Sequence, residues 1–319
     1  MEFFVNLNHA PIIQSVKSRI VKLGPKSSVL RLMLKAHGRM HGFGVRFSGA
    51  AIAITRGKQE IDLPMNHFVE VPITMECFDD FFRSIEPKQR DGRSVLDFSV
   101  PGLHVYRRGG IAFHFPGLPE EDSMEAYTAW YQPGPGDVVW DVGAHAGATS
   151  YFLSQAVGPT GKVYAFEPDE SNYAYLLRNI EMHGLTNVVP VKKGLAGKTG
   201  KVVFQADGTM SAGIQDYLLY SERGNSVEID AISLPDACAE FGSVPSYVKM
   251  DIEGAEVAVI QGAAEFLKKN AISFAIESYH PLAEGQLTYE VLDRIFPEIG
   301  YRAESSARFG QMFTWAKPS

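Results

Sequence analysis

The stretch from residue 138 to residue 150 constrains the fold more than any other part of the chain. Its sequence, VVWDVGAHAGATS, is an apolar run that ends in an acid, a segment with two glycines, and the start of a helical pattern. This order predicts a strand, a tight turn and a helix. The first turn of such a helix offers unpaired backbone N–H groups and the positive end of the helix dipole. We therefore expect a ligand at this turn, where Gly143 lets the backbone approach it closely.

The spacing of the glycines limits which ligand this can be. A dinucleotide-binding turn has the pattern G-x-G-x-x-G, in which the second glycine makes room for the pyrophosphate. Here Gly143 and Gly147 are separated by three residues, and His145 occupies the position of that second glycine. No segment has the P-loop pattern G-x-x-x-x-G-K-[ST] either. An NAD-dependent oxidoreductase is accordingly disfavoured.

A second apolar run, at residues 162 to 167, ends in Glu167 and Pro168. An acid at this place can hydrogen-bond both ribose hydroxyls of a nucleoside. Asp141, which precedes the glycine turn, adds a carboxylate that can hold an ammonium group. An ammonium group and a nucleoside without a pyrophosphate describe S-adenosylmethionine.

Several motifs in this order resemble the FkbM family of S-adenosylmethionine-dependent methyltransferases. They are Asp141-Val-Gly-Ala-His-x-Gly147, Phe166-Glu167-Pro168, Asn179, Lys249-Met-Asp-Ile-Glu-Gly-Ala-Glu256 and the late Glu277 with His280. The resemblance covers about residues 120 to 280. One departure lies in the turn from Gly194 to Lys198, where Ala196 and Gly197 stand at positions that tend to be acidic in the family.

The resemblance implies an S-adenosylmethionine-dependent enzyme that methylates a hydroxyl of a sugar, glycolipid, polyketide or similar metabolite. The alternatives are N-methylation, or a domain that binds the cofactor without turnover. The residues expected to contact the cofactor are Asp141, Gly143, Ala144, His145, Gly147, Thr149, Ser150, Glu167, Pro168, Asn172, Leu195 and Asp251.

The catalytic candidates follow from what methyl transfer to a hydroxyl requires. Positioning carries much of the rate, and the hydroxyl proton needs an acceptor. Asp251, His145 and His280 are the candidate acceptors. Lys249 can stabilise negative charge on the attacking oxygen; the alternative is a buried structural ion pair, because period two places it on the same face as Asp251.

A metal site is the competing interpretation of the acids after residue 250. Asp251, Glu253 and Glu256 can be ligands for a cation. The two glutamates begin a predicted helix, however, where acids are ordinarily explained by the helix dipole. Without a neighbouring Asp-Asn pair or a clustered histidine, we expect no metal.

Composition and charge bound the remaining possibilities. The chain has 319 residues, 45% of them hydrophobic, which suffices for one large domain and a smaller one. Its net charge of −7 argues against nucleic-acid binding. Cys77 and Cys238 lack metal-ligand spacing and are expected to be buried thiols in a reducing compartment. Without a signal peptide or an apolar run long enough to span a membrane, we expect a soluble, cytoplasmic protein.

The basic residues are concentrated at the start of the chain. Residues 1 to 46 contain eight Lys and Arg but only one acid. In the helix predicted after Ser28, Arg31, Lys35 and Arg39 recur every four residues and form one stripe. The ordinary interpretation is a helix face that is solvated, or packed on the body or on a second subunit of a homo-oligomer. The alternative is a peripheral contact with an anionic membrane, or with an acidic glycan or lipid acceptor.

We expect two domains. Residues 1 to 118 are predicted to form basic helices, broken near Gly24-Pro25, and a small β-rich α+β unit. Residues 119 to 319 alternate strands and helices, which predicts an α/β fold of the Rossmann-like class I methyltransferase type, a mostly parallel sheet with helices on both faces. Its ligand belongs at the carboxyl ends of the strands, where Asp141, Glu167, Asp251 and Glu277 lie.

Several less regular segments are also assigned from the pattern. One strand is predicted over residues 45–55, and a meander over 94–100, 104–107 and 111–115. Continuous helices are predicted over residues 75–85, 120–130 and 255–269.

Overall fold

A computed structural model describes residues 24, 26–119, 122–206, 213–214, 225–282, 285–308 and 311–319. The chain forms two compact units, Met1–Asp122 and Ser123–Ser319. The boundary predicted at residue 118 falls inside the first unit. The helical piece predicted before residue 24 lies outside the described residues.

The first unit contains the predicted second helix, α3 (Ser28–Met40). The side chain of Ser27 caps this helix and accepts a hydrogen bond from the backbone N–H of Leu30 at 3.4 Å. Leu30, Leu34 and Gly38 turn inward and are buried.

A five-stranded sheet follows, in the order β1-β2-β3-β5-β4. Its strands are β1 (Gly44–Ser48), β2 (Ala51–Arg56), β3 (Gln59–Pro64), β4 (Lys88–Arg90) and β5 (Arg93–Asp97). The single strand predicted over residues 45–55 is therefore wrong: the chain turns at Gly49, whose φ is +55°. The predicted meander is also wrong, because β6 (Gly102–Tyr106) and β7 (Ile111–Phe115) form a separate two-stranded sheet.

Short helices connect β3 to β4. They are η1 (Met65–Glu70), α4 (Val71–Glu76) and α5 (Phe78–Ser84). The helix predicted over residues 75–85 is thus broken at Cys77, whose φ and ψ of −89° and 12° are not helical. Both cysteines are buried and free, as predicted, and burial raises the pKa of the Cys238 thiol to about 12.

The second unit is built on a seven-stranded sheet in the order β10-β9-β8-β15-β16-β18-β17. The first five of these strands are parallel, and β18 and β17 close the sheet as an antiparallel pair. Both features confirm the predicted fold class. The strands are β8 (Val138–Val142), β9 (Lys162–Phe166), β10 (Val188–Val191), β15 (Tyr247–Met250), β16 (Ser273–Glu277), β17 (Tyr301–Arg308) and β18 (Gln311–Pro318).

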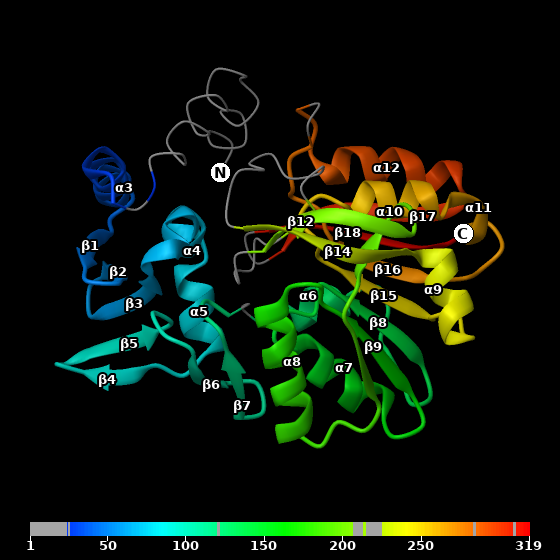
Figure 1. The fold of residues 1–319 in the computed structure, drawn as a ribbon, viewed down its shortest axis with the longest axis horizontal. Helices are drawn as coiled ribbons and strands as arrows, with labels where there is room; N and C mark the ends of the chain where they lie inside the picture. The colour runs from blue at the N-terminus through cyan, green and yellow to red at the C-terminus, as the bar shows by residue number, and fades with distance from the viewer. Residues whose placement is uncertain are drawn as a thin grey trace. The chain divides into compact units, whose positions relative to one another are not determined.

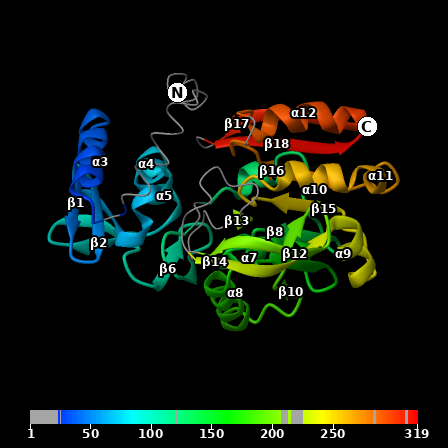
Figure 2. The ribbon, with the colours of Figure 1, turned by 45° about the horizontal axis from the view of Figure 1, so that its top comes forward.

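Helices cover both faces of this sheet (Figures 1 and 2). One face carries α6 (Met124–Tyr127), α7 (Ala148–Val157) and α8 (Glu170–Met182). The other carries α9 (Leu234–Phe241), α10 (Glu256–Gly262), α11 (Ala264–Leu267) and α12 (Thr288–Glu298). Because both faces are covered, β15 is buried along its whole length.

Two predicted helices differ from the observed ones. The described part of the segment at residues 120–130 has one helical turn, α6. The helix predicted over residues 255–269 is interrupted at Ala263, which separates α10 from α11.

A second, four-stranded sheet in the order β11-β14-β12-β13 lies within this unit. It consists of β11 (Gly194–Ala196), β12 (Gly200–Ala206), β13 (Gly213–Ile214) and β14 (Asn225–Ser233). Among the described residues, no helix is both long and apolar enough to cross a membrane.

Leu176 and Leu177 are neighbours in α8 with opposite surroundings, and they give a matched test of this packing. Leu176 is fully buried, whereas Leu177 is 41% exposed. Leu176→Ala should lower the free energy of unfolding by about 2–5 kcal/mol, since it removes buried methyl groups and leaves a cavity. Leu177→Ala should change it by less than about 0.5 kcal/mol. Urea denaturation of both variants measures the difference, and equal losses would contradict the assignment of this face to the core.

Candidate active site

The glycine turn lies between β8 and α7, at the carboxyl edge of the sheet. The backbone N–H groups of Gly143 and Ala144 both donate to the carbonyl of Phe166, at 3.1 and 2.9 Å. Alternate residues of the turn have left-handed backbones, with φ of +79° at Gly143, +47° at His145 and +85° at Gly147. The turn is thereby attached to the end of the neighbouring strand β9.

Gly143 is required by close packing against backbone as well as by its own backbone conformation. A Cβ atom on Gly143 would lie 1.9 Å from the carbonyl oxygen of Asp251, and one on Gly147 would lie 2.6 Å from Leu176 Cδ1. The Asp251 carbonyl cannot move aside as the end of the Leu176 side chain can, so at Gly147 it is the positive φ that favours glycine. The turn after β8 and the segment after β15 therefore meet at this edge, as expected for adjacent parallel strands.

Glu167 follows β9 and holds the turn. Its Oε2 accepts a hydrogen bond from the His145 N–H at 2.8 Å, and its Oε1 accepts one from the Asp169 N–H at 2.9 Å. Burial raises the pKa of Glu167 to about 8, although both of these hydrogen bonds act to lower it. Each oxygen keeps a further lone pair, so the carboxylate fits the predicted ribose contact.

Lys249 is fully buried in the middle of β15. Its Nζ donates to the carbonyl of Gly143 at 2.7 Å and lies 3.3 Å from Asp141 Oδ1. The sheet register places Lys249 beside Asp141 on the adjacent strand. The other oxygen of Asp141 accepts a hydrogen bond from Ser150 Oγ at 2.6 Å.

A contact of Asp141 with the ammonium group of the cofactor stays a prediction. Its carboxylate is fully buried, and the ammonium group beside it in the structure is that of Lys249. Lys249 thus forms a buried ion pair with Asp141, and its predicted role toward the attacking oxygen is likewise untested.

Sequence reasoning missed Tyr127, which comes from the short helix α6. Its hydroxyl donates to Glu277 Oε1, and the Lys249 Nζ lies 5.3 Å from the centre of its ring. The Tyr247 hydroxyl and the Trp315 indole N–H fix α6 by hydrogen bonds of 2.7 Å to its carbonyl groups. No motif marks Tyr127, because its function depends on strands that lie far away in sequence.

Acids from the segment after β15 surround His280, which follows β16. His280 Nδ1 lies 3.2 Å from Glu256 Oε1, and Nε2 lies 3.7 Å from Asp251 Oδ1 and 3.6 Å from Glu253 Oε2. Burial alone would lower the pKa of His280, but Glu256, Glu253 and Asp251 outweigh it and raise the pKa to about 10. A pKa raised in this way favours the protonated imidazole, which has no free nitrogen to accept a further proton. The role of His280 as acceptor of the hydroxyl proton stays a prediction.

The other predicted cofactor contacts stay predictions. The structure places Ala144, Thr149, Asn172 and Leu195 among the buried residues and Pro168 half-buried beside Glu167. His145 is 5% exposed, and its role as a base is equally untested. Asn179, quoted among the family motifs, donates from Nδ2 to the carbonyl of Ala146 at 2.7 Å and so helps to shape the turn.

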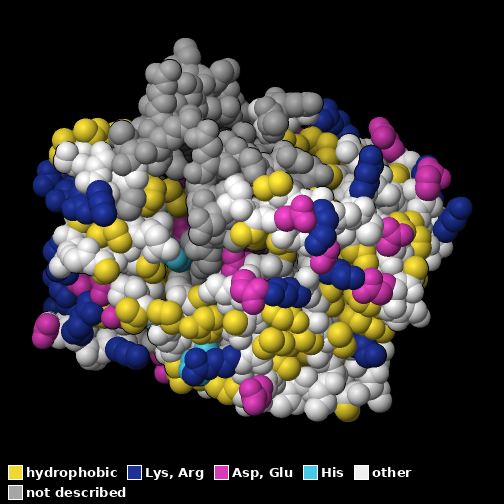
Figure 3. Space-filling model, in the orientation of Figure 1, with side chains coloured by type: hydrophobic (Ala, Val, Ile, Leu, Met, Phe, Trp, Pro, Cys, Tyr) yellow, Lys and Arg dark blue, Asp and Glu magenta, His cyan; other side chains and the backbone are white. Residues whose placement is uncertain are grey.

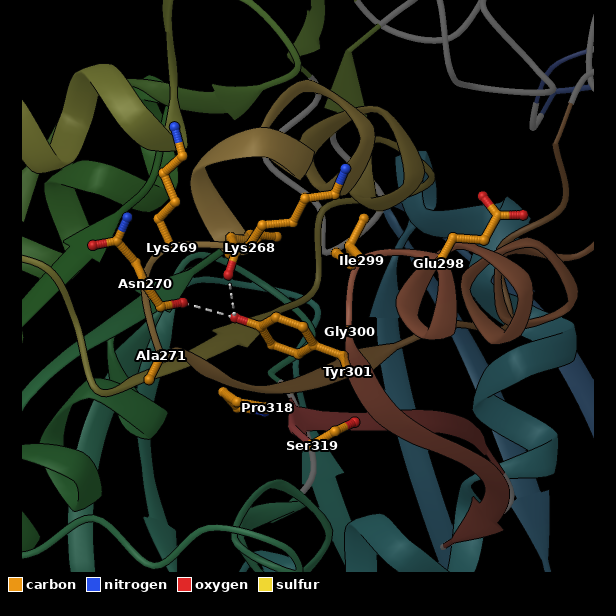
Figure 4. Close-up of a pocket in the computed structure, with 11 residues that line it drawn as sticks. Lys268, Lys269, Asn270, Ala271, Glu298, Ile299, Gly300, Tyr301, Pro318 and Ser319 are labelled. Carbon is orange, nitrogen blue, oxygen red and sulfur yellow. Dashed lines mark hydrogen bonds between the residues drawn. The ribbon is translucent and has the colours of Figure 1, made fainter.

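A hollow of about 570 Å³ lies elsewhere in this unit, at the amino end of β16 (Figure 4). Lys268, Lys269 and Tyr301 line it, and the Tyr301 hydroxyl donates to the carbonyl of Asn270 at 2.9 Å. In an open α/β sheet, ligands bind at the carboxyl ends of the strands. This hollow is therefore distinct from the cofactor site.

The fold and the site together define a class of protein. The first five strands have the order 3-2-1-4-5 of a Rossmann-like sheet. The acid Glu167 follows β9, the second of these strands along the chain. In the turn after β8, His145 lies where a dinucleotide-binding protein would hold the pyrophosphate. This is the fold of class I S-adenosylmethionine-dependent methyltransferases. The profile of the methyltransferase FkbM domain matches residues 141–303. The chain belongs to this family, and S-adenosylmethionine is its cofactor.

Similar proteins were found by sequence and by structure. The hexuronic acid methyltransferase AglP of Haloferax volcanii is 32% identical over 146 residues, which are 45% of this chain and 56% of AglP. The chain thus spans about half the length of this relative. A protein-L-isoaspartate O-methyltransferase of Aeropyrum pernix is 41% identical over 66 residues, 21% of this chain and 25% of that protein. The FkbM methyltransferase structure from Methylobacillus flagellatus has a TM-score of 0.43 and 17% identity, covering 59% of this chain and 45% of that one.

If Glu167 holds the ribose, we expect cofactor binding to depend on pH. Ribose hydroxyls that donate to its carboxylate favour the ionised form, whereas burial without ligand favours the neutral form below about pH 8. S-adenosylhomocysteine should therefore bind more tightly as the pH rises from 6 to 8, with release of a proton. In the free protein the raised pKa has the opposite consequence: stability falls as the pH rises from about 4.5 to 8.

Calorimetry at pH 7 in two buffers of different ionisation enthalpy measures this proton. Glu167→Gln is the control, because the amide keeps the shape of the side chain but has no proton to release. If the wild type shows the same apparent enthalpy in both buffers, the ribose contact at Glu167 is not made by a carboxyl group that must ionise.

Proposed function

We propose that the protein transfers a methyl group from S-adenosylmethionine to a hydroxyl of a sugar or of a sugar-containing metabolite. The observation that carries this proposal is Asp251. Its Oδ1 is buried and has no hydrogen-bond partner among the described residues, although it lies at the edge of the sheet beside the glycine turn. The family match and the name of AglP, a hexuronic acid methyltransferase, support a sugar acceptor.

The residues of the turn fit the cofactor that the family implies. Glu167 would hold the ribose, and the uncapped first turn of α7 faces the same edge. Asn172 and Leu195 are proposed to flank the nucleoside. When bound, the cofactor supplies a methyl group on a sulfonium sulfur, which passes to the acceptor oxygen and leaves a thioether.

Asp251 is proposed to accept the proton that the hydroxyl loses. Burial raises the pKa of Asp251, while Lys249 and His280 act to lower it. A carboxylate so placed has more affinity for a proton than one in water, which suits a general base. Lys249 and Tyr127 fix the surrounding backbone rather than touch the acceptor.

Asp251→Asn should lower kcat about 10²- to 10⁴-fold, because the amide cannot take up the proton. Its affinity for S-adenosylhomocysteine should stay close to that of the wild type. Transfer of label from the methyl donor to uronic-acid and neutral saccharides gives the rate, and calorimetry gives the affinity. Asp293→Asn, at an exposed acid on α12, is the matched control.

Full turnover in Asp251→Asn would remove the assigned base. Label recovered on nitrogen would favour the N-methylation alternative. Tight binding of the cofactor without transfer to any saccharide tested would favour a domain that binds without turnover.

We further propose that α3 contacts an anionic membrane surface. Large apolar side chains on this helix are exposed: Val29 56%, Leu32 67%, Met33 42% and Met40 80%. They lie beside the basic stripe formed by Arg31, Lys35 and Arg39. Figure 3 shows hydrophobic and basic side chains side by side on the part of the surface that contains α3. Apolar area next to basic charge is the composition of helices that lie in a bilayer interface.

Binding to vesicles that contain phosphatidylserine tests this contact. Each basic residue near an anionic bilayer contributes about 1 kcal/mol, and salt screens the attraction. The Arg31→Glu, Lys35→Glu, Arg39→Glu triple variant should therefore lose binding, and the wild type should lose it at high salt.

A control variant replaces three exposed lysines elsewhere by glutamate, at Lys58, Lys88 and Lys269. It has the same net charge as the α3 variant. Failure of the wild type to bind at low salt, or equal loss in both triple variants, contradicts a specific role for α3. A concentration-dependent change in mass without vesicle binding would instead favour a homo-oligomer.

A further inference from the structure

Asp251, Glu253 and His280 bring three ligating side chains together at the carboxyl edge of the sheet, and we propose that this cluster binds one divalent transition-metal ion. Each residue offers one atom, and these three atoms all lie within 4.8 Å of one another. The sequence led us to expect no metal, because no histidine is near the acids along the chain. The fold supplies one from the end of the neighbouring strand β16.

The separations suit a shared cation better than direct hydrogen bonds. His280 Nε2 lies 3.7 Å from Asp251 Oδ1 and 3.6 Å from Glu253 Oε2, which is too far for a hydrogen bond. Ligand bonds of 2.0–2.2 Å place neighbouring ligand atoms roughly 3.0–3.5 Å apart. An inward movement of the three side chains would therefore bring all three atoms to ligand distance from one ion.

His280 is the second, independent observation that points to a ligand. The side chain is 4% exposed, and Nε2 has no hydrogen-bond partner within the described part of the chain. Its Nε2 faces the gap between Asp251 and Glu253. An imidazole this deeply buried loses its water and requires a partner in exchange.

Glu256 completes an arrangement common around bound metals. Its Oε1 lies 3.2 Å from His280 Nδ1 and also accepts a hydrogen bond from the Ile252 N–H at 3.0 Å. A metal-ligating histidine usually donates its second N–H to a carboxylate, which fixes the ring and its tautomer. Glu256 is fully buried, so it is well placed to hold Nδ1–H while Nε2 binds the ion.

Glu253 reaches the cluster from an unusual backbone conformation. Its φ is +57°, a left-handed value that residues with side chains rarely adopt. The conformation brings its carboxylate opposite Nε2. Asp251 contributes Oδ1 from the first position after β15.

The donor set indicates the kind of ion. One imidazole and two carboxylates suit Mn²⁺, Co²⁺ or Zn²⁺, whereas Mg²⁺ and Ca²⁺ prefer oxygen ligands alone. Three protein ligands leave positions for water or for an acceptor oxygen.

A role in catalysis rests on the proposed function. An acceptor hydroxyl bound at an open position would be acidified by the ion. Its oxygen would form the new bond to carbon as the carbon–sulfur bond breaks, and its proton would go to Asp251 Oδ2, the oxygen not used as a ligand. The sulfonium becomes a neutral thioether in this step.

The test uses the full chain after treatment with a chelator and without cofactor. Electron paramagnetic resonance and calorimetry follow the titration with Mn²⁺, and one ion per chain is expected. Glu253→Gln and His280→Gln should each weaken binding at least tenfold, since even residues behind a ligand change metal affinity by about 10–100-fold. Glu265→Gln, at an exposed glutamate on α11, should bind as the wild type does. Co²⁺ should give an absorption spectrum that His280→Gln alters.

Binding of S-adenosylhomocysteine to the same samples separates the two proposals and shows that each variant is folded. Normal binding of this ligand together with no stoichiometric Mn²⁺, or with Mn²⁺ affinity unchanged in both ligand variants, overturns the metal site and leaves the cofactor site standing. Mn²⁺ binding without binding of the nucleoside would overturn the proposed function instead.

Discussion

A buried ammonium group holds the catalytic edge of the sheet together. Lys249 lies in a strand covered on both sides, where an unpaired charge would be very costly. It is compensated by Asp141 on the adjacent strand, by the carbonyl of Gly143 and by the ring of Tyr127. Removal of one partner of such a pair generally costs about 3–5 kcal/mol. The position of the turn after β8 is thus tied to β15 and α6, and the residues that face the cofactor inherit that rigidity.

Much of the second unit could be predicted from its pattern of apolar runs. The strands of a parallel sheet are buried on both faces, so β8, β9, β15 and β16 stand out as short apolar segments between helices. Breaks within helices could not be predicted in the same way. Cys77 interrupts a helix without a proline or glycine to mark the place, because packing against the rest of its unit decides the local geometry there. Gly262 precedes the break at Ala263, but a single glycine inside a helical pattern is not enough to predict that the helix ends.

The residues of the site also fall into those that could be predicted from the sequence and those that could not. Acids that end parallel strands must meet at one edge, and this rule placed Glu167, Asp251 and Glu277 together after the family resemblance had singled out Asp251 and Glu277. Contacts that depend on strand register or on distant loops could not be predicted from the sequence. The pairing of Lys249 with Asp141 requires knowledge of which strands are adjacent, and the acids around His280 come from a segment more than twenty residues away in the sequence.

The alternation of left-handed residues in the glycine turn limits how this active site can be redesigned. At Gly143 both the sign of φ and the neighbouring Asp251 carbonyl exclude a side chain, and at Gly147 the sign of φ strongly favours glycine. At His145 the positive φ restricts the choice of residue, and Asn, Asp and His adopt a positive φ more readily than other residues with side chains. In a combinatorial library designed for a new acceptor, most variants with substitutions at these three positions would therefore disrupt the turn. Diversity is better introduced after β16, in the segment around Tyr279, where the described residues have ordinary backbones and border the cluster around His280.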